Sequence, residues 1–377
     1  MKKVIVGLSG GVDSSVALYL LQQAGYQVEA LFMRNWDSNL NNDILGNQQI
    51  NDIICPQEVD YQDAKAVSQK LGIPIHRVDF IKEYWDYVFT HFIAEYKKGR
   101  TPNPDILCNK YIKFDFFLKT ALEQYHGDYI AMGHYARVTY NETLQEYQLL
   151  RGVDATKDQS YFLCQLSQTQ LAKTLFPLGD LTKPAVRTIA EQLGLPTATK
   201  KDSTGICFIG ERDFKKFLEN YIPNQVGDIV DIETNKILGH HSGVMYYTIG
   251  QRRGLNLGGM AQAYFVVGKN VAKNILYVAN SSEEQWLYSN SCLVNDTNWI
   301  NKLQTNNFTC TAKFRYRQKD IPVSVEILSP TSCLVRFVEK VKAITPGQSA
   351  VFYQGEVCLG GGVIEAAYLD DTKLWYL

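Results

Sequence analysis

The side chains best suited to chemistry near the start of the chain lie in Ser9-Gly-Gly-Val-Asp-Ser-Ser15. Its two glycines allow a tight backbone and the close approach of a ligand. An apolar run at residues 3–8 precedes this loop, and a helical pattern ended by Gly25 follows it. The loop is therefore predicted to join a buried strand to a helix, whose free N–H groups form an anion site.

Asp13 distinguishes this loop from the ATPase P-loop, where a lysine next to Ser or Thr holds the phosphates. A carboxylate repels phosphates unless a cation lies between them, so Asp13 predicts a magnesium ion. The alternative is an ordinary Gly-rich turn with a serine N-cap. The complete heptapeptide, placed directly after the first strand, favours the anion site.

Cys108 and Cys207 are the candidate nucleophiles among eight scattered cysteines. Cys108 follows a segment stiffened by Pro102 and Pro104 and precedes a helical pattern, so a lowered thiol pKa is expected there. Cys207 lies in a Ser/Thr/Gly loop after two lysines, where a thiolate is again plausible. The alternative for each is a small buried apolar residue. No CxxC or paired spacing indicates zinc or a disulfide framework, and a reduced cytoplasmic protein fits.

The first half of the chain alternates strand and helix patterns, which predicts an α/β fold with a Rossmann-like parallel sheet. Strands are expected at 3–8, 28–33, 75–79 and 129–132, and helices at 15–24, 61–71, 85–98 and 114–125. Ligands of such sheets bind beyond the carboxyl ends of the strands. Met33 could pack on a nucleotide base there, although core packing is the commoner role, and Gly133 could let adenine or ribose come close.

Length and composition describe an ordinary water-soluble protein of two or three domains. The 377 residues carry a net charge of −1, so a nucleic-acid surface would have to be a local patch. We see no apolar run long enough to span a membrane and no signal peptide before the first strand. An Asn-rich segment, 38–52, is expected to be a lid or a plain excursion of the chain.

Changes in the pattern of predicted strands and helices divide the chain into residues 1–210, 211–281 and 282–377. The second part is small and β-rich, and the third reads as an antiparallel β-barrel. Strand periodicity would place Lys313, Arg315 and Arg317 on one face, suited to a phosphate backbone or to a charged, solvated edge strand.

The loop motif resembles the pyrophosphate loop of the N-type ATP pyrophosphatases, which cut ATP between the α- and β-phosphates and adenylate a substrate oxygen. Further motifs resemble the tRNA-specific 2-thiouridylase family throughout the chain. They lie at residues 103–110, 133–137, 157–159, 202–210, 247–255 and 313–317.

The resemblance implies an enzyme that replaces the C2 oxygen of a tRNA wobble uridine with sulfur, releasing AMP and pyrophosphate. ATP and Mg²⁺ would bind the loop, with Asp13 on the metal and with nucleotide contacts from Gly7, Leu8, Ser9, Gly10, Gly11, Val12, Asp13, Ser14, Met33 and Gly133. Cys207 would carry a persulfide. Cys108 would either close a disulfide with it or assist attack by sulfide.

The resemblance also implies partners. Asn103, Pro104 and Asp105 would hold the flipped base. Further tRNA contacts would be His134, Lys157, Asp158, Gln159, Arg315, Tyr316 and Gln348. The expected substrates are tRNAs of the Lys, Glu and Gln type, and the sulfur would come from a cysteine desulfurase or a sulfur-relay protein. The competing hypotheses are another adenylating enzyme of the superfamily and a nucleotide-sensing RNA-binding protein without chemistry.

Overall fold

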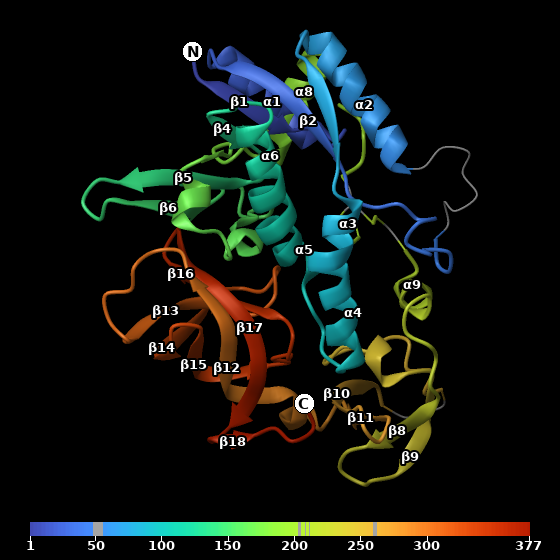
Figure 1. Cartoon of the computed structure of the whole chain (residues 1–377). Helices are drawn as coiled ribbons and strands as arrows, with labels where there is room; N and C mark the ends of the chain where they lie inside the picture. Colours follow the sequence, from blue (N-terminus) through green and yellow to red (C-terminus); the bar gives the residue numbers. More distant parts are fainter. Residues whose placement is uncertain (48–55, 203–204, 208, 211, 259–261) are drawn as a thin grey trace.

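The computed structural model describes residues 1–47, 56–202, 205–207, 209–210, 212–258 and 262–377. Figure 1 shows an α/β region at the top, a β-barrel at the lower left and a small β-sheet at the lower right. The predicted fold class is confirmed. No helix in the described part of the chain is long and apolar enough to cross a membrane.

The α/β region is built on a five-stranded parallel sheet with the strand order β3-β2-β1-β4-β7. The strands are β1 (Lys3–Gly7), β2 (Gln27–Arg34), β3 (Ile75–Asp79), β4 (Tyr129–Ala131) and β7 (Thr174–Leu175). Val4 and Val6 pack with helices α1 (Val12–Gln23) and α2 (Pro56–Leu71). Ile5 faces the opposite cluster, so the central strand is buried on both faces, as parallel strands usually are.

Two long helical rods descend from this sheet toward the barrel and the small sheet (Figure 1). The first joins α3 (Ile81–Tyr84), the π-helix η1 (Trp85–Phe89) and α4 (Thr90–Lys97). The second joins α5 (Pro104–Leu107), the π-helix η2 (Cys108–Phe116) and α6 (Phe117–Glu123). The second rod begins ten residues before the predicted start at 114, so Cys108 lies inside a helix and not in front of one.

The barrel closes through pairing of β12 with both β15 and β17. Its strands are β12 (Tyr288–Trp299), β13 (Asn307–Lys313), β14 (Ile321–Ser329), β15 (Ser332–Lys342), β16 (Ser349–Gln354) and β17 (Val357–Leu369), all antiparallel. A hairpin from the α/β region, β5 (Ala136–Asn141) and β6 (Glu146–Arg151), extends the same sheet because β6 pairs with β17.

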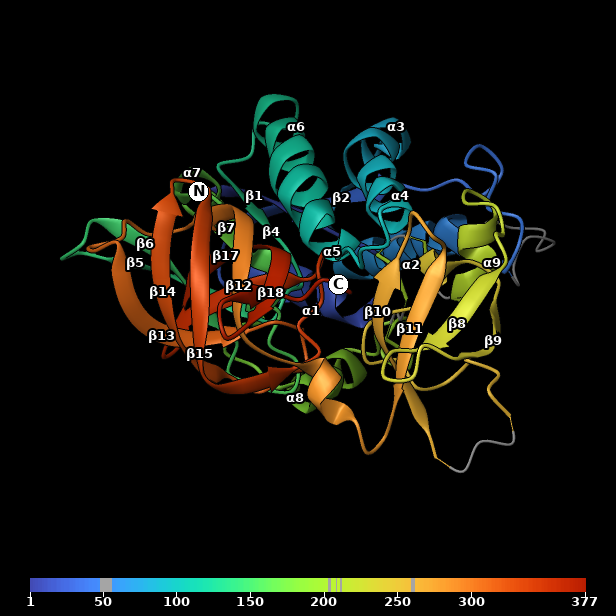
Figure 2. The same ribbon diagram turned by 90° about the horizontal axis from the view of Figure 1, so that it is seen from below.

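The small sheet has the order β10-β11-β8-β9 and lies beside the barrel when the molecule is seen from below (Figure 2). The strands are β8 (Gly227–Asp231), β9 (Ile237–His241), β10 (Tyr264–Asn270) and β11 (Ile275–Asn280). The remaining short elements are η3 (Ser160–Leu163), α7 (Gln168–Leu171), α8 (Lys183–Gln192), α9 (Phe214–Glu219), η4 (Val244–Tyr246), η5 (Glu284–Leu287) and β18 (Thr372–Lys373).

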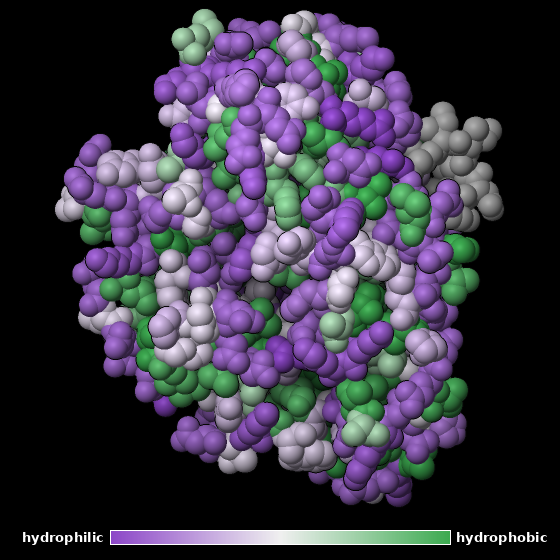
Figure 3. Space-filling model, in the orientation of Figure 1, coloured by the Kyte–Doolittle hydropathy of each residue, from purple (hydrophilic) through white to green (hydrophobic). Residues whose placement is uncertain are grey.

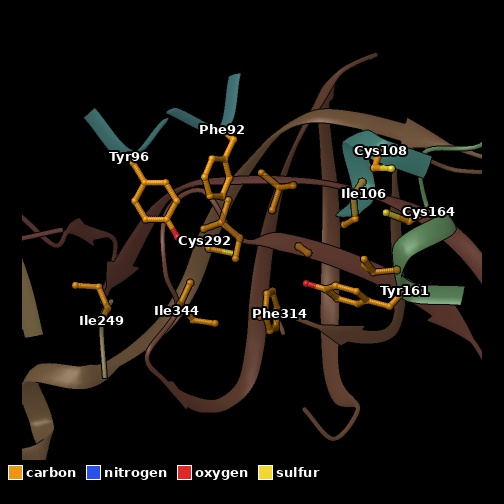
Figure 4. Packing of buried hydrophobic residues seen from close by; sticks show 14 of the residues in the cluster. Phe92, Tyr96, Ile106, Cys108, Tyr161, Cys164, Ile249, Cys292, Phe314 and Ile344 are labelled. Carbon is orange, nitrogen blue, oxygen red and sulfur yellow. The ribbon is translucent and has the colours of Figure 1, made fainter. Parts of the chain in front are cut away.

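The rods and the barrel share one apolar core, in which α4, α5 and η3 meet the barrel strands (Figure 4). Phe92 and Tyr96 of α4 lie in the same cluster as Cys292 and Phe314 of the barrel. The face seen in Figure 3 is mostly hydrophilic, with apolar residues scattered in small groups. Shared burial fixes the barrel against the α/β region.

The predicted strand face of Lys313, Arg315 and Arg317 is wrong. Strand β13 ends at Lys313, and a turn follows in which Phe314 is buried. The Nη2 atom of Arg315 donates to the carbonyl of Ile249, at 2.9 Å, and to further protein oxygens. The chain turns there because the Phe314 N–H donates to Gln318 Oε1 (2.8 Å) and the Gln318 N–H donates to the Arg315 carbonyl (3.0 Å).

Candidate active site

The Gly-rich loop has the predicted position between β1 and α1, and the helix begins within the motif, at Val12. The Ser9 N–H donates to Ser14 Oγ (3.1 Å), and Ser15 Oγ donates to the Gly11 carbonyl (2.7 Å). Gly10 has a φ of +75°, and a Cβ there would lie 2.1 Å from the Asp60 carbonyl oxygen. The loop is held by its own serines and by the neighbouring helix α2, and its path requires glycine at position 10.

A cavity of about 500 Å³ connects this loop with Cys207. Nine of the predicted nucleotide contacts line it: Gly7, Leu8, Ser9, Gly11, Val12, Asp13, Ser14, Met33 and Gly133. So do five of the predicted tRNA contacts, Asp105, His134, Lys157, Gln159 and Tyr316. The predicted residues outside its lining are Gly10, Asn103, Pro104, Cys108, Asp158, Arg315 and Gln348.

Cys108 and Cys207 come together from two separate elements. Their Sγ atoms are 3.7 Å apart, and both are free thiols. Burial raises the pKa of the Cys108 thiol well above its ordinary value, so the predicted lowering at that position is wrong. The hydrogen bond from Cys108 lowers the pKa of Cys207, which agrees with the thiolate expected there.

Two buried polar side chains, one on each rod, hold the backbone of Cys207. Asp105 Oδ1 accepts the Cys207 N–H (3.2 Å), and the Tyr84 hydroxyl donates to the Cys207 carbonyl (2.9 Å). Asn103 in turn caps α5 by accepting the N–H of Asp105, with Pro104 at the first helical position. The Asn-Pro-Asp segment therefore positions the loop that contains Cys207. Ser203, Thr204 and Phe208 of that loop lie outside the described residues.

Family models match residues 2–211 (tRNA methyl transferase HUP domain), 215–280 (tRNA methyl transferase PRC-barrel domain) and 289–364 (Aminomethyltransferase beta-barrel domain). A protein of Mycoplasma capricolum named tRNA-specific 2-thiouridylase MnmA is 64% identical over 97% of this chain and 98% of its own length. Proteins with the same name from Mesoplasma florum (62% identical, 97% and 99% covered) and Mycoplasmopsis synoviae (60% identical, 100% and 99% covered) also match.

This chain belongs to the tRNA-specific 2-thiouridylase family. The similarity extends over nearly the whole length of the chain and of these relatives, so all three regions share it. The expected family is thus confirmed.

In this thiouridylase the carboxylate of Asp13 is paired with a lysine that the sequence analysis did not single out. Lys183 Nζ lies 2.8 Å from both oxygens of Asp13 and 2.7 Å from Asp202, and the Tyr135 hydroxyl donates to Asp13 (2.8 Å). Burial opposes ionisation of Asp202, but hydrogen bonds from Lys157 and Lys183 lower its pKa to about 2. Lys183 is the first residue of α8, a position that favours acidic side chains because of the helix dipole. A lysine at the start of a helix was therefore the sequence feature that could have indicated its role.

Other predicted residues in this thiouridylase have structural partners. Nε2 of His134 lies 3.1 Å from Asn109 Oδ1, and burial lowers the pKa of His134 well below its ordinary value. Asp158 accepts the N–H groups of Gly152 and Ser160. Gln159 accepts the Tyr135 N–H, Lys157 pairs with Asp202, and Gln348 donates to the Thr101 carbonyl (2.8 Å).

Met33, near the end of β2, and Gly133, just beyond the end of β4, lie at the same edge of the sheet, with β1 between the two strands. Met33 is 7% exposed and belongs to the core cluster while lining the cavity, so both of its expected roles fit the structure. A Cβ on Gly133 would lie 2.8 Å from the backbone nitrogen of Ser14. The glycine therefore lets the end of β4 approach the loop, in addition to facing the cavity.

The Asn-rich segment is described only up to Asn47, and residues 48–52 of the expected lid lie outside the described residues. Its first part is anchored: Asp43 is fully buried, accepts from Trp36 Nε1 (3.0 Å) and pairs with Arg212 (2.8 Å). The Tyr221 hydroxyl donates to the Asn41 carbonyl (2.8 Å). These contacts tie the segment to the chain that follows the Cys207 loop.

Proposed function

We propose that this chain is a tRNA-uridine 2-sulfurtransferase, which uses ATP to replace the C2 oxygen of the wobble uridine with sulfur. The observation that carries this proposal is the single cavity lined by both the Gly-rich loop and Cys207. The activity named for its full-length relatives supports it. A nucleotide on the loop and a uracil ring beside Cys207 would share that space.

The first chemical step is adenylation of the base. The uridine O2 attacks the α-phosphorus of ATP, the bond from that phosphorus to the bridging oxygen breaks, and pyrophosphate leaves. The N-terminus of α1 and the ammonium of Lys183 provide positive potential at the loop. The oxygen on C2 has then become part of an AMP leaving group.

The second step delivers sulfur. A persulfide on Cys207 is attacked at Sγ by the sulfur of Cys108, a Cys108–Cys207 disulfide forms, and the terminal sulfur leaves as hydrosulfide. Hydrosulfide then adds to C2 and expels AMP. The distance of 3.7 Å between the sulfurs is close enough for this exchange after a small movement, since a disulfide bond measures about 2.05 Å. Attack by the terminal persulfide sulfur itself, assisted by Cys108, remains the second route.

Magnesium fits the residues around the loop. The carboxylates of Asp13 and Asp202 both reach Lys183 Nζ, and Mg²⁺ is commonly held by one or two carboxylates together with substrate phosphates. Among the described residues, no group of three or more acidic, Cys or His side chains could hold a metal without such phosphates. Asp13 and Asp202 would hold the ion, which neutralises charge on the pyrophosphate.

The partners follow from the chemistry. The substrates would be tRNAs of the Lys, Glu and Gln type, and the persulfide would come from a cysteine desulfurase or a sulfur-relay protein. His134 lines the cavity, and its buried Nδ1 has no hydrogen-bond partner among the described residues, so a small movement of the ring would let it bind a base. Free thiols at Cys108 and Cys207 fit a reducing compartment such as the cytoplasm.

The test is product analysis of ATP turnover with and without tRNA that carries a wobble uridine, in the presence of a persulfide source. AMP and pyrophosphate formed only with tRNA, together with sulfur in the RNA, would support the proposal. ADP and phosphate would contradict adenylation. AMP without sulfur in the RNA would point to another adenylating enzyme, and no turnover would point to a binding protein.

A further inference from the structure

The π-helix η2 changes which residues of the second rod share a face. In a π-helix the backbone hydrogen bonds join residues five apart, whereas in an α-helix residues three and four apart lie above one another. Cys108 and Lys113 are five residues apart and both belong to η2. The unusual helix therefore brings the ammonium of Lys113 to the side of the rod that carries the Cys108 thiol.

Lys113 also reaches the second cysteine. It lines the cavity together with Asp105 and Cys207, and its side chain hydrogen-bonds to the Cys207 sulfur. Burial alone would lower the pKa of Lys113, but the neighbouring Cys207, Cys108 and Asp105 outweigh burial and raise it. The ammonium thus stays charged beside two sulfur atoms.

The charged and titratable groups around this point come from five segments of the chain. They are Asp105 on α5, Tyr84 on α3, His134 after β4, and the two thiols. Burial raises the pKa of Tyr84 and lowers that of His134, so both are neutral near pH 7. Lys113 is consequently the positive group of this cluster, and the thiols compete for it with Asp105.

We propose that Lys113 is a positioning residue for sulfur transfer, whose ammonium holds Cys207 as a thiolate and balances the single negative charge that the two cysteines pass between them. This inference rests on the proposed function. In this proposal, the π-helix η2 places the Lys113 ammonium beside the two cysteines.

The charge balance of each step supports the assignment. The Cys207 thiolate attacks the outer sulfur of an ionised donor persulfide, R–S–S⁻; the S–S bond of the donor breaks, a new S–S bond forms on Cys207, and the donor leaves as its own thiolate, RS⁻. The product, an ionised persulfide, again carries one negative charge. When Cys108 attacks Sγ of Cys207, its proton goes to the departing sulfur, which leaves as HS⁻. One cation next to both sulfurs therefore matches the charge of the thiolate, the persulfide and the hydrosulfide stages.

The experiment measures how fast iodoacetamide alkylates Cys207 as a function of pH, in the full chain without tRNA or ATP. Mass spectrometry of the Cys207 peptide separates it from Cys108. Lys113→Met removes the charge at similar length, and Lys113→Arg keeps it. Lys110→Met is the matched control, because Lys110 lies on the same helix with its Nζ on Gln165 Oε1 (3.1 Å).

Lys113→Met is expected to raise the pH midpoint of Cys207 alkylation by at least about one unit, a loss of about tenfold in thiolate at pH 7. Lys113→Arg should stay within about threefold of the parent chain, and Lys110→Met should match it. An unchanged midpoint in a folded Lys113→Met chain would overturn the proposal.

Asp105→Asn provides an independent test if Lys113→Met does not fold. Removing the carboxylate that competes for the ammonium should lower the Cys207 midpoint, and an unchanged or raised midpoint would overturn the proposal. Because alkylation needs neither ATP nor RNA, failure of thiolation with the expected midpoints would count against the proposed function and not against the role of Lys113.

Discussion

The Sγ atoms of Cys108 and Cys207 lie 3.7 Å apart although 99 positions separate the two residues in the chain. Asp105 and Tyr84, on two different rods, hold the N–H and the carbonyl of Cys207 in place. The fold itself therefore brings the two sulfur atoms together.

The two cysteines should differ in what their loss removes. Cys207→Ser should abolish sulfur incorporation into tRNA while tRNA-dependent AMP formation stays detectable, because serine cannot carry a persulfide. Cys108→Ser should still accept a persulfide on Cys207 but release its sulfur more slowly. Radiolabelled sulfur in tRNA and AMP release would be measured in parallel.

The control for both substitutions is Cys310→Ala, which alters a nearly buried barrel thiol far from the cavity lining. It should retain both activities. Sulfur incorporation by Cys207→Ser at the parent rate would remove the persulfide from the mechanism.

Gly10→Ala should damage ATP use and stability together. A left-handed φ costs a non-glycine residue about 1–2 kcal/mol, and the added Cβ would also press on the Asp60 carbonyl. Gly25→Ala is the matched control, because Gly25 has a similar φ of +81° with nothing within 4 Å of the added Cβ. Urea unfolding and AMP formation would be compared. Equal losses in both variants would show that the Asp60 contact does not restrict the loop.

Lys183→Met should weaken ATP turnover and change the acid sensitivity of the fold. The folded pKa of Asp202, about 2, lies below its unfolded value, so its ionisation stabilises the protein above about pH 4 and that contribution disappears as the pH falls toward 2. Without Lys183 the folded pKa should rise, and less stability should be lost over this interval.

Unfolding by urea between about pH 2 and pH 5 measures the effect. Lys82→Met removes an exposed ion pair with Asp86 and should leave the profile unchanged. A Lys183→Met profile that coincides with that of the parent chain would show that Lys183 does not govern the ionisation of Asp202.

His134→Gln should flatten the pH dependence of stability between about pH 7 and pH 5. His134 is neutral in the fold, so below about pH 6.5 only the unfolded chain binds the extra proton, and stability falls with pH. The substitution should remove up to about 1.4 kcal/mol per pH unit from that slope. His91→Gln, on the exposed side of α4, is the control. A steep slope that persists in His134→Gln would contradict a buried neutral imidazole.

Local patterns were sufficient for the parallel sheet and its loop. Strand β3 has the predicted bounds, Ile75–Asp79, because Gly72 and Pro74 end the preceding helix just before it. Strand β7 has only two residues, Thr174 and Leu175, and gives no pattern to recognise. The helix around Cys108 was predicted too late because Pro104, read as a helix breaker, is in fact the first residue of α5.

The part of the candidate site that comes from one continuous motif was predictable. The part that the fold assembles from distant segments was not. The loop from Ser9 to Ser14 is a continuous signal in the sequence. Neighbours such as Lys183 and Tyr135 come from distant segments, and nothing in their local sequence names Asp13 as their partner. The turn at Arg315 was missed because it is closed by hydrogen bonds to Gln318, while the buried and exposed residues go on alternating as in a strand.

The hairpin β5–β6 belongs to the α/β region by sequence and to the barrel sheet by pairing, through Leu150 opposite Val357. During synthesis on the ribosome the hairpin emerges long before β17, so its outer edge has no strand to pair with until almost the whole chain has been made. Cutting the chain between β6 and β17 would leave an unpaired strand edge on each fragment, and such edges promote aggregation. Separately expressed halves of this enzyme should therefore fail to fold. Pairing of the last barrel strands with the hairpin should be the step that completes folding of the whole chain.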